Sequence, residues 1–236
     1  MFRHQGKTRK YSHNLQIAIL LSVVAGMVNV IGFLLIGRLT TNVTGHFAFL
    51  VDEVFKFELQ KSLIFLYYII AFLLGSFASS IFVEYYQKIN ERKIFVIPIL
   101  IEAALIFSIS LIEIEYLKSH VDFIAILLLF SMGLQNSLVT KISNSLVRTT
   151  HLTGLFTDLG IELSQLFFYK EEEKRKFLLA NIKLRLSIIT GFFIGGFVAG
   201  LMFNSYLQYS LIAPSVLLIF GLYYDLLKFK LKRWHH

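Results

Sequence analysis

The segment Thr40-Thr41-Asn42-Val43-Thr44-Gly45 recurs 109 residues later as Thr149-Thr150-His151-Leu152-Thr153-Gly154. Further matches lie on both sides of these two Thr-Gly motifs and keep the same order. Upstream, Gly26-Met27-Val28-Asn29 corresponds to Gly133-Leu134-Gln135-Asn136, and downstream Gly75-Ser76-Phe77-Ala78 corresponds to Gly195-Gly196-Phe197-Val198. The only two prolines, Pro98 and Pro214, follow at matching places. Because these matches share one order, we interpret the chain as an internal duplication.

Each copy contains three apolar stretches long enough to cross the hydrocarbon core of a membrane, which needs about 17 to 25 residues. They are 15–36, 63–83 and 94–112 in the first copy and 123–138, 186–203 and 207–227 in the second. The shorter apolar segments 47–55 and 155–169 follow the Thr-Gly motifs and carry acidic residues, so we expect short broken or re-entrant helices there. The predicted fold class is an all-α integral membrane protein with six transmembrane helices. Three spans per copy is an odd number, so the two repeats are expected to be inverted relative to each other.

The positions of Lys and Arg predict the orientation. With six crossings and both termini in the cytoplasm, 19 of the 23 basic residues lie inside and 4 lie outside. If the two short segments also cross, the division becomes 17 against 6 and the repeats become parallel, but the termini stay inside. We therefore expect a multi-pass protein of the bacterial inner membrane. Its expected parts are a basic N-terminus at 1–13, repeats at 14–115 and 116–227 with a charged insertion near 170–183, and a basic C-terminus at 228–236.

Composition narrows the class of protein. Hydrophobic residues make up 56% of the 236 residues and charged residues only 16%, whereas a soluble domain is nearer one quarter charged. The net charge of +8 maps to the cytoplasmic edges, so it indicates orientation and the lipid bilayer as partner rather than nucleic acid. The chain has no Cys, no nucleophile or phosphate-binding motif and no metal-ligand spacing. We therefore expect neither an enzyme nor a cofactor.

The Thr-Gly motifs are expected to interrupt the helices. Thr and Asn side chains compete for backbone hydrogen bonds, and Gly adopts conformations that other residues resist. We expect Thr44 and Thr153 to cap the short helices that follow, with the free N–H groups directed at a polar or anionic solute. The alternative is an interfacial turn in which the Thr side chains only satisfy the backbone.

Polar residues within spans usually face a bundle interior or a cavity. Asn29 and Asn136 occupy matching places, although hydrogen bonding between helices would also explain them. Arg38 and Arg148 precede the two motifs and either hold an anion or lie at the headgroup level. The predicted solute-binding residues are Asn29, Arg38, Thr41, Asn42, Thr44, Gly45, Asn136, Arg148, Thr150, His151, Thr153 and Gly154.

Three acidic residues are candidates for coupling or gating. Asp158 and Glu162 are four residues apart and share a helix face, with Arg148 as the expected partner. A solvated cytoplasmic face is the alternative. Glu102 follows Pro98 by one turn and corresponds to Leu218 in the second copy. It either couples protons or lies close enough to the interface to remain solvated, and the second alternative is favoured.

Small residues line one face of the fifth span at Gly191, Gly195, Gly196 and Gly200. This spacing lets two helices approach closely. Packing between the two repeats is the default interpretation, and a homodimer through this face is the alternative.

The motifs also resemble those of a known family. Gly32-Phe33 through Arg38, TTNVTGH, Met132-Gly133-Leu134-Gln135-Asn136-Ser137-Leu138 and TGLFTDL are similar to the YoaK-like family of bacterial multi-pass membrane proteins, over about residues 14 to 227. The chain departs from the pattern at His46, where relatives commonly have Asn. The resemblance implies a six-helix inner-membrane protein and gives no substrate, because the family is a domain of unknown function.

Two functions from different classes follow from these observations. The first is a transporter or channel-like protein that binds a small polar or anionic solute where the two repeats meet. The second is a non-transporting membrane protein that binds a protein partner or lipid, in which the Thr-Gly motifs are purely structural. The two differ in whether the Thr-Gly motifs meet around a polar cavity.

Overall fold

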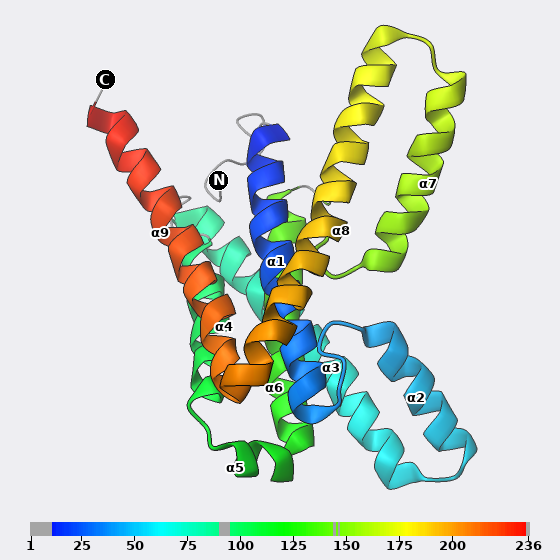
Figure 1. Cartoon of the computed structure of the whole chain (residues 1–236), viewed down its shortest axis with the longest axis vertical. Coiled ribbons are helices and arrows are strands. Elements are labelled where there is room, and N and C mark those ends of the chain that lie inside the picture. The colour runs from blue at the N-terminus through cyan, green and yellow to red at the C-terminus, as the bar shows by residue number, and fades with distance from the viewer. Residues whose placement is uncertain (1–10, 90–94, 144, 146, 235–236) are drawn as a thin grey trace.

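The computed structural model describes residues 11–89, 95–143, 145 and 147–234, with side chains except at 88–89 and 225–234, and these residues contain helices and no strands. The prediction of an all-α chain is confirmed. The helices are α1 (Tyr11–Ile36), α2 (Val43–Phe55), α3 (Leu59–Ile89), α4 (Val96–Ser110), α5 (Ile114–Ser119), α6 (Val121–Ile142), α7 (Leu152–Phe168), α8 (Glu172–Tyr206), the 3-10 helix η2 (Leu207–Leu211) and α9 (Ile212–Trp234) (Figure 1). The basic N-terminal residues 1–10, Arg92 and Lys93, and residues 235–236 lie outside the described residues.

Four helical stretches among the described residues are long and apolar enough to cross a membrane by length and composition, and α4 is a shorter apolar helix. The last stretch, 172–224, contains α8 and the first part of α9. These are separate helices because Leu207 adopts φ 46, which interrupts the helical path. The sequence-predicted span at 207–227 therefore begins later, at Ile212, after the turn of η2.

The helices α1, α3, α4, α6, α8 and α9 run along the long axis of the molecule in alternating directions (Figure 1). In that view α1, α4 and α8 run downward, while α3, α6 and α9 run upward, so the start of α1 and the end of α9 both lie toward the upper end. The short helices α2 and α7 leave the middle of the molecule toward opposite ends, α2 toward the lower end and α7 toward the upper end. In both places the chain leaves a long helix, returns to mid-height as a loop and starts a short helix there.

The long helices of one half of the chain pack mainly on those of the other half: α1 lies against α8, and α3 lies against α6. Glycines set the spacing at both contacts. A Cβ on Gly26 of α1 would lie 2.0 Å from the backbone oxygen of Phe192 in α8, and a Cβ on Gly75 of α3 would lie 2.0 Å from that of Phe130 in α6. The two crossings therefore bring backbones together closely enough to exclude any larger residue.

The glycine-rich face of α8 packs within the chain. A Cβ on Gly195 would lie 2.2 Å from the backbone oxygen of Val23, and Gly191 and Gly196 face Ser22 and Val30 of α1. Internal packing, the default interpretation of these glycines, therefore accounts for them, since α1 covers this face. The short helices pack outside this core, α2 against α3 and α7 against α8.

Candidate functional site

A cavity of about 500 Å³ lies where the two Thr-Gly motifs meet, and we call it the central cavity. Residues from α1, α3, α6, α8 and the starts of α2 and α7 surround it. Its lining is Asn29, Leu39, Thr41, Asn42, Val43, Thr44, Phe72, Asn136, Thr150, His151, Leu152, Thr153 and Phe192. Of the twelve predicted solute-binding residues, eight therefore line one cavity. The four that do not are Arg38, Gly45, Arg148 and Gly154.

The lining consists of matched pairs from the two halves of the chain. Asn29 faces the cavity with Asn136, and Asn42 with His151. The remaining pairs are Thr41 with Thr150, Val43 with Leu152, Thr44 with Thr153, and Phe72 with Phe192; Leu39 alone has no partner in the lining. Sequence reasoning missed the two phenylalanines. The sequence does contain a signal for them, because Phe72 and Phe192 are separated by the same 120 residues as Gly75 and Gly195.

The start of α2 is capped by Asn42. Its Oδ1 accepts a hydrogen bond of 2.9 Å from the backbone N–H of Gly45. The prediction that Thr44 and Thr153 are the caps is wrong, since the helices begin at Val43 and Leu152, and the residue before each occupies the N-cap position. A cap accepts from the backbone N–H groups two or three residues later, and Asn42 fits that geometry.

His151 occupies the equivalent position at the start of α7, and its side chain makes no capping hydrogen bond. Its ring lies over the first turn, because a Cβ on Gly154 would lie 2.4 Å from His151 Nδ1. At α2 the corresponding Cβ on Gly45 would lie 3.0 Å from Asn42 Nδ2. Both glycines thus make room for the N-cap side chain, which explains their place in the motif although neither lines the central cavity.

The two asparagines of the central cavity differ in their hydrogen bonds. Thr41 donates to Asn29 Oδ1 over 2.9 Å, which ties the loop before α2 to α1. Asn136 Oδ1 is buried and has no hydrogen-bond partner among the described residues. Buried polar atoms are usually satisfied. The second half of the chain therefore leaves an acceptor free beside the cavity.

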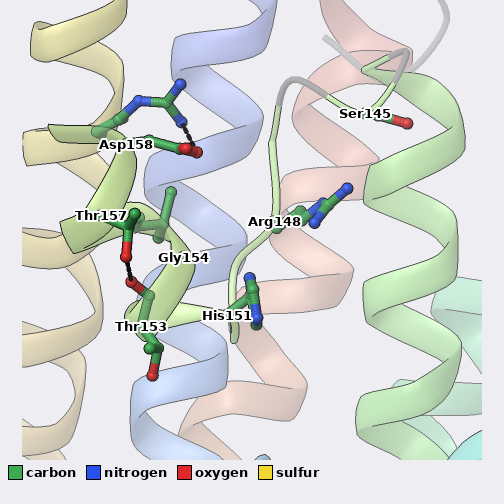
Figure 2. A pocket seen from close by; sticks show the side chains of 9 residues that line it. Ser145, Arg148, His151, Thr153, Gly154, Thr157 and Asp158 are labelled. Carbon is green, nitrogen blue, oxygen red and sulfur yellow. Dashed lines mark hydrogen bonds and ion pairs between the residues drawn. The ribbon is translucent and has the colours of Figure 1, made fainter. Parts of the chain in front are cut away.

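A second cavity of about 550 Å³ lies above the first on the α7 side, and we call it the vestibule (Figure 2). It is lined by Ser145, Arg148, His151, Thr153, Gly154, Leu155, Thr157, Asp158 and Arg185. His151 and Thr153 line both cavities, so the two spaces adjoin at the start of α7. Arg148 and Gly154, which the central cavity lacks, are found here.

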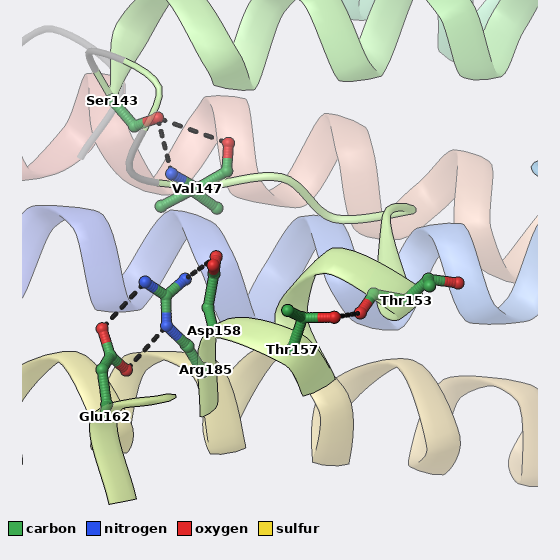
Figure 3. Close-up of polar contacts among 7 residues, drawn as sticks. All are labelled: Ser143, Val147, Thr153, Thr157, Asp158, Glu162 and Arg185. Atoms are coloured by element: carbon green, nitrogen blue, oxygen red, sulfur yellow. Dashed lines mark hydrogen bonds and ion pairs between the residues drawn. The ribbon is translucent and has the colours of Figure 1, made fainter. Parts of the chain in front are cut away.

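Asp158 and Glu162 bind Arg185 of α8, which sequence reasoning missed (Figure 3). Arg185 Nη1 lies 3.0 Å from Asp158 Oδ2, and its Nε and Nη2 donate to the two oxygens of Glu162 over 2.7 and 2.8 Å. The expected pairing of these acids with Arg148 is therefore wrong, because α8 lies against α7 and brings its own guanidinium to both carboxylates. Arg185 lies one residue before the predicted start of the fifth span, and basic residues at span ends are usually assigned to orientation.

Arg148 is placed by a tight loop between α6 and α7. The backbone N–H of Val147 donates to Ser143 Oγ over 3.0 Å, and Ser145 adopts φ 65 (Figure 3). Gln135 of α6 donates to Thr149 Oγ1 over 3.1 Å. The residues on both sides of Arg148 are thus held by side chains of α6 or its end, which fixes the backbone from which the arginine extends.

The lower end of the molecule is closed around α2. His46 is buried, with Nε2 2.6 Å from the backbone oxygen of Leu39, and its ring lies 4.9 Å from that of Tyr68. Tyr68 donates to Asp122 and accepts a hydrogen bond from Arg38 Nε over 3.2 Å. Arg38 therefore lies outside the central cavity, where it ties the loop before α2 to α3 and α6.

Glu102 is fully buried in α4, and neither carboxyl oxygen has a hydrogen-bond partner among the described residues. The favoured interpretation, a carboxyl close enough to the interface to remain solvated, is wrong. The reason is that α4 packs against α6 and α9, which cover this position. Glu102 lines none of the cavities described above.

Comparison with known proteins places the sequence among membrane proteins. Residues 17–224 match the family described as "Protein of unknown function (DUF1275)". The chain is 27% identical over 207 residues to the UPF0700 transmembrane protein YoaK of Bacillus subtilis (strain 168), covering 86% of this chain and 89% of that protein. No solved structure matches the chain. The similarity predicted from the Thr-Gly and Met-Gly-Leu-Gln-Asn motifs is confirmed.

Proposed function

The chain belongs to the DUF1275 family of proteins of unknown function, and we propose that it binds a small polar or anionic solute in the central cavity and lets it cross the membrane. In this proposal six helices cross the bilayer: α1, α3, α4, α6, α8 and α9. The short helices α2 and α7 lie on opposite sides of the membrane midplane, and the N-terminus of each lies near mid-depth. The observation that carries the proposal is that both Thr-Gly motifs line the same cavity.

An arrangement as two inverted repeats is supported by the order of the helices. Each half contains a long helix, a loop with a Thr-Gly motif, a short helix, a second long helix and one further helix, which is α4 in the first half and α9 in the second. The short helices leave mid-height in opposite directions (Figure 1). The paired lining of the central cavity and the paired glycine contacts fit a pseudo-two-fold axis through the cavity. Transporters built from inverted repeats bind their solutes at such an interface.

Six crossings are supported by the acidic residues of the short helices. α2 carries Asp52 and Glu53 within 13 residues, and α7 carries Asp158 and Glu162 within 17 residues, and carboxylates are costly inside lipid. With six crossings, both termini lie on one side, and the distribution of Lys and Arg assigns that side to the cytoplasm of a bacterial inner membrane. The vestibule then faces the cytoplasm, because its lining residues belong to α7, α8 and the loop between α6 and α7, and α7 extends toward the end of the molecule where α1 begins and α9 ends (Figure 1).

The chemistry of the central cavity suits a polar or anionic solute. Two helix N-termini point at it, and each contributes free N–H groups and the positive end of a helix dipole. Asn and Thr side chains add hydrogen-bonding groups, and Phe72 and Phe192 add apolar walls. None of the described lining residues is Asp, Glu, Lys or Arg. Since no carboxylate balances the two dipoles, a cation is disfavoured there.

The test is a flux measurement on purified protein in liposomes, with urea and glycerol as neutral solutes and formate and chloride as anions. We expect faster entry of at least one of these solutes than into empty liposomes. Replacing Asn136 by Leu together with Thr41 by Val removes polar groups from the cavity and is expected to lower that flux at least tenfold.

The matched control is Ser108→Ala, since Ser108 is exposed on α4 and its hydroxyl only donates to the backbone of Leu105. Its flux is expected to equal that of the wild type. If no solute crosses faster than in empty liposomes, transport is excluded. Thermal stabilisation by one of these solutes without flux would instead favour a non-transporting binding protein.

A further inference from the structure

The vestibule contains a positive charge, Arg148, that no acidic side chain among the described residues neutralises. Arg148 is exposed, and it makes no ion pair with any residue that the structure describes. The acids nearest to it along the chain are Asp158 and Glu162, and Arg185 engages both of them. Arg185 thus has two carboxylates while Arg148 has none. Figure 2 shows Arg148 on the loop that descends from Ser145 to His151, beside the start of α7.

Hydrogen-bond donors without partners accompany this charge. The N–H groups in the first turn of α7 receive no cap from His151. A helix leaves its first four N–H groups without partners in the helix. At α7 they belong to the segment whose residues His151 and Thr153 line both the vestibule and the central cavity. An arginine and uncapped backbone donors together form the set that binds small anions in proteins.

The loop that presents Arg148 is held in place. Ser143 accepts from Val147 N–H over 3.0 Å, and Thr149 accepts from Gln135 over 3.1 Å. A guanidinium on a fixed backbone loses less freedom when it binds an anion than one on a mobile loop does. An anion that enters the vestibule would meet Arg148 and the start of α7, and the central cavity adjoins the vestibule there.

The opposite end of the molecule differs in its charge and in its cap. Leu39 is the residue equivalent to Arg148, at the 109-residue offset of the motifs. Asn42 caps α2, and Arg38 is paired with Asp122, whose Oδ1 lies 3.7 Å from Arg38 Nη2. An uncharged solute would not bind more strongly at the end with the unpaired arginine than at the other end. An anion would be drawn to one end.

We propose that the vestibule is a capture site for small anions and that Arg148 makes anions, rather than neutral polar solutes, the substrate class of this protein. This inference rests on the proposed function, because it takes the central cavity as the path that the anion then follows. Arg148 acts as a specificity-determining residue: it concentrates anions at the start of α7 and leaves neutral solutes unaffected. Its effect is screened by salt, since the site is exposed to solvent.

The test compares entry of formate and of urea into liposomes that contain the wild type, Arg148→Gln or Arg148→Lys. We expect Arg148→Gln to lower formate entry at low ionic strength about tenfold or more, and to leave urea entry within about twofold, because only the anion interacts with the charge. Arg148→Lys keeps the charge and is expected to retain most of the formate entry. Raising the salt concentration with an impermeant electrolyte is expected to reduce the difference between wild type and Arg148→Gln.

The matched control is Arg175→Gln at the start of α8, an exposed arginine at the same end of the molecule but outside the vestibule. It is expected to behave as the wild type, which separates a local site from a general effect of net charge. Equal formate entry by wild type and Arg148→Gln would overturn the capture site while leaving the proposed function in place. Equal loss of formate and urea entry would also overturn it. Failure of formate, chloride, urea and glycerol alike to enter in the wild type would overturn the proposed function itself.

Discussion

The short helices α2 and α7 begin with the same motif but are fastened to their neighbours by different chemistry. On α2, the ring of Phe49 stacks on that of Phe65 of α3, with the ring centroids 5.3 Å apart. On α7, the equivalent contact is the ion pair of Asp158 with Arg185 of α8, at 3.0 Å. The correspondence follows from the offsets of 109 residues for the motifs and 120 residues for α3 and α8.

This difference in chemistry accompanies a difference in packing between the two ends. Aromatic rings pack without water, and around α2 the rings of Phe49, Phe65, Tyr68 and His46 form a continuous cluster. An ion pair keeps its charged groups near water, because full burial would cost more than the pairing returns. The vestibule lies beside Asp158 and Arg185. Duplicated segments that share one backbone arrangement thus carry an aromatic cluster at one end and an ion pair beside a cavity at the other.

The largest expected effect comes from breaking the ion pairs of α7. Arg185→Ala leaves the carboxylates of Asp158 and Glu162 without a cation, and Glu162 is buried. We expect a loss of about 3 kcal/mol in the free energy of unfolding, measured by titration with denaturing detergent in mixed micelles.

The triple variant Asp158→Phe, Glu162→Gln, Arg185→Phe replaces the ion pair between α7 and α8 with an aromatic contact like that between α2 and α3. It is expected to recover most of the stability lost in Arg185→Ala, since it removes the charges together. If Arg185→Ala were as stable as the wild type, the claim that the ion pairs of Arg185 hold α7 against α8 would be wrong.

The second-largest expected effect concerns the two glycine crossings, α1 with α8 and α3 with α6, at which the two halves of the chain are alike. Gly26→Ala and Gly75→Ala each place a methyl group 2.0 Å from a backbone oxygen, so the helices must move apart. We expect losses of about 2 kcal/mol for both, within about 1 kcal/mol of each other, in the same unfolding measurement. Gly200→Ala is the control, because its Cβ would first meet a side chain at 3.9 Å. A large effect at only one of the two crossings would contradict their equivalence.

Glu102 is a place where the halves differ within the core. Its counterpart, Leu218, is buried and apolar. Replacing Glu102 by Leu removes a buried polar group that has no partner among the described residues, so we expect a gain of about 1 to 2 kcal/mol. A loss of stability would show that the carboxyl is satisfied by water or by a bound group. Thermal unfolding in detergent with and without the substitution decides between these outcomes.

The smallest expected effect concerns the two caps. Asn42→Ala removes the hydrogen bond to Gly45 and is expected to cost about 1 kcal/mol. His151→Ala removes no capping bond, so it is expected to cost less than half as much. Both are measured by the same detergent titration. Equal losses would mean that His151 stabilises α7 in another way.

Much of this architecture was predictable from the sequence because it depends on pattern. The repeated Thr-Gly motif, the apolar spans and the intramembrane asparagines are local features, and Asn29 and Asn136 do line one cavity. The partner of Asp158 was not predictable, because it depends on which turn of α8 lies beside α7. The caps were misplaced by two residues, since Asn42 and both threonines have side chains that favour an N-cap, whereas His151 occupies that position without capping.

The most direct test of the central claim uses the absence of cysteine from the chain. Thr44→Cys and Thr153→Cys place one thiol from each Thr-Gly motif in the central cavity. Treating membranes that contain the double variant with a short bifunctional thiol reagent is expected to join the two peptides, which mass spectrometry of the digested protein detects. Each single variant is the control. Labelling of both cysteines without any cross-link would contradict the meeting of the two motifs and with it the proposed path.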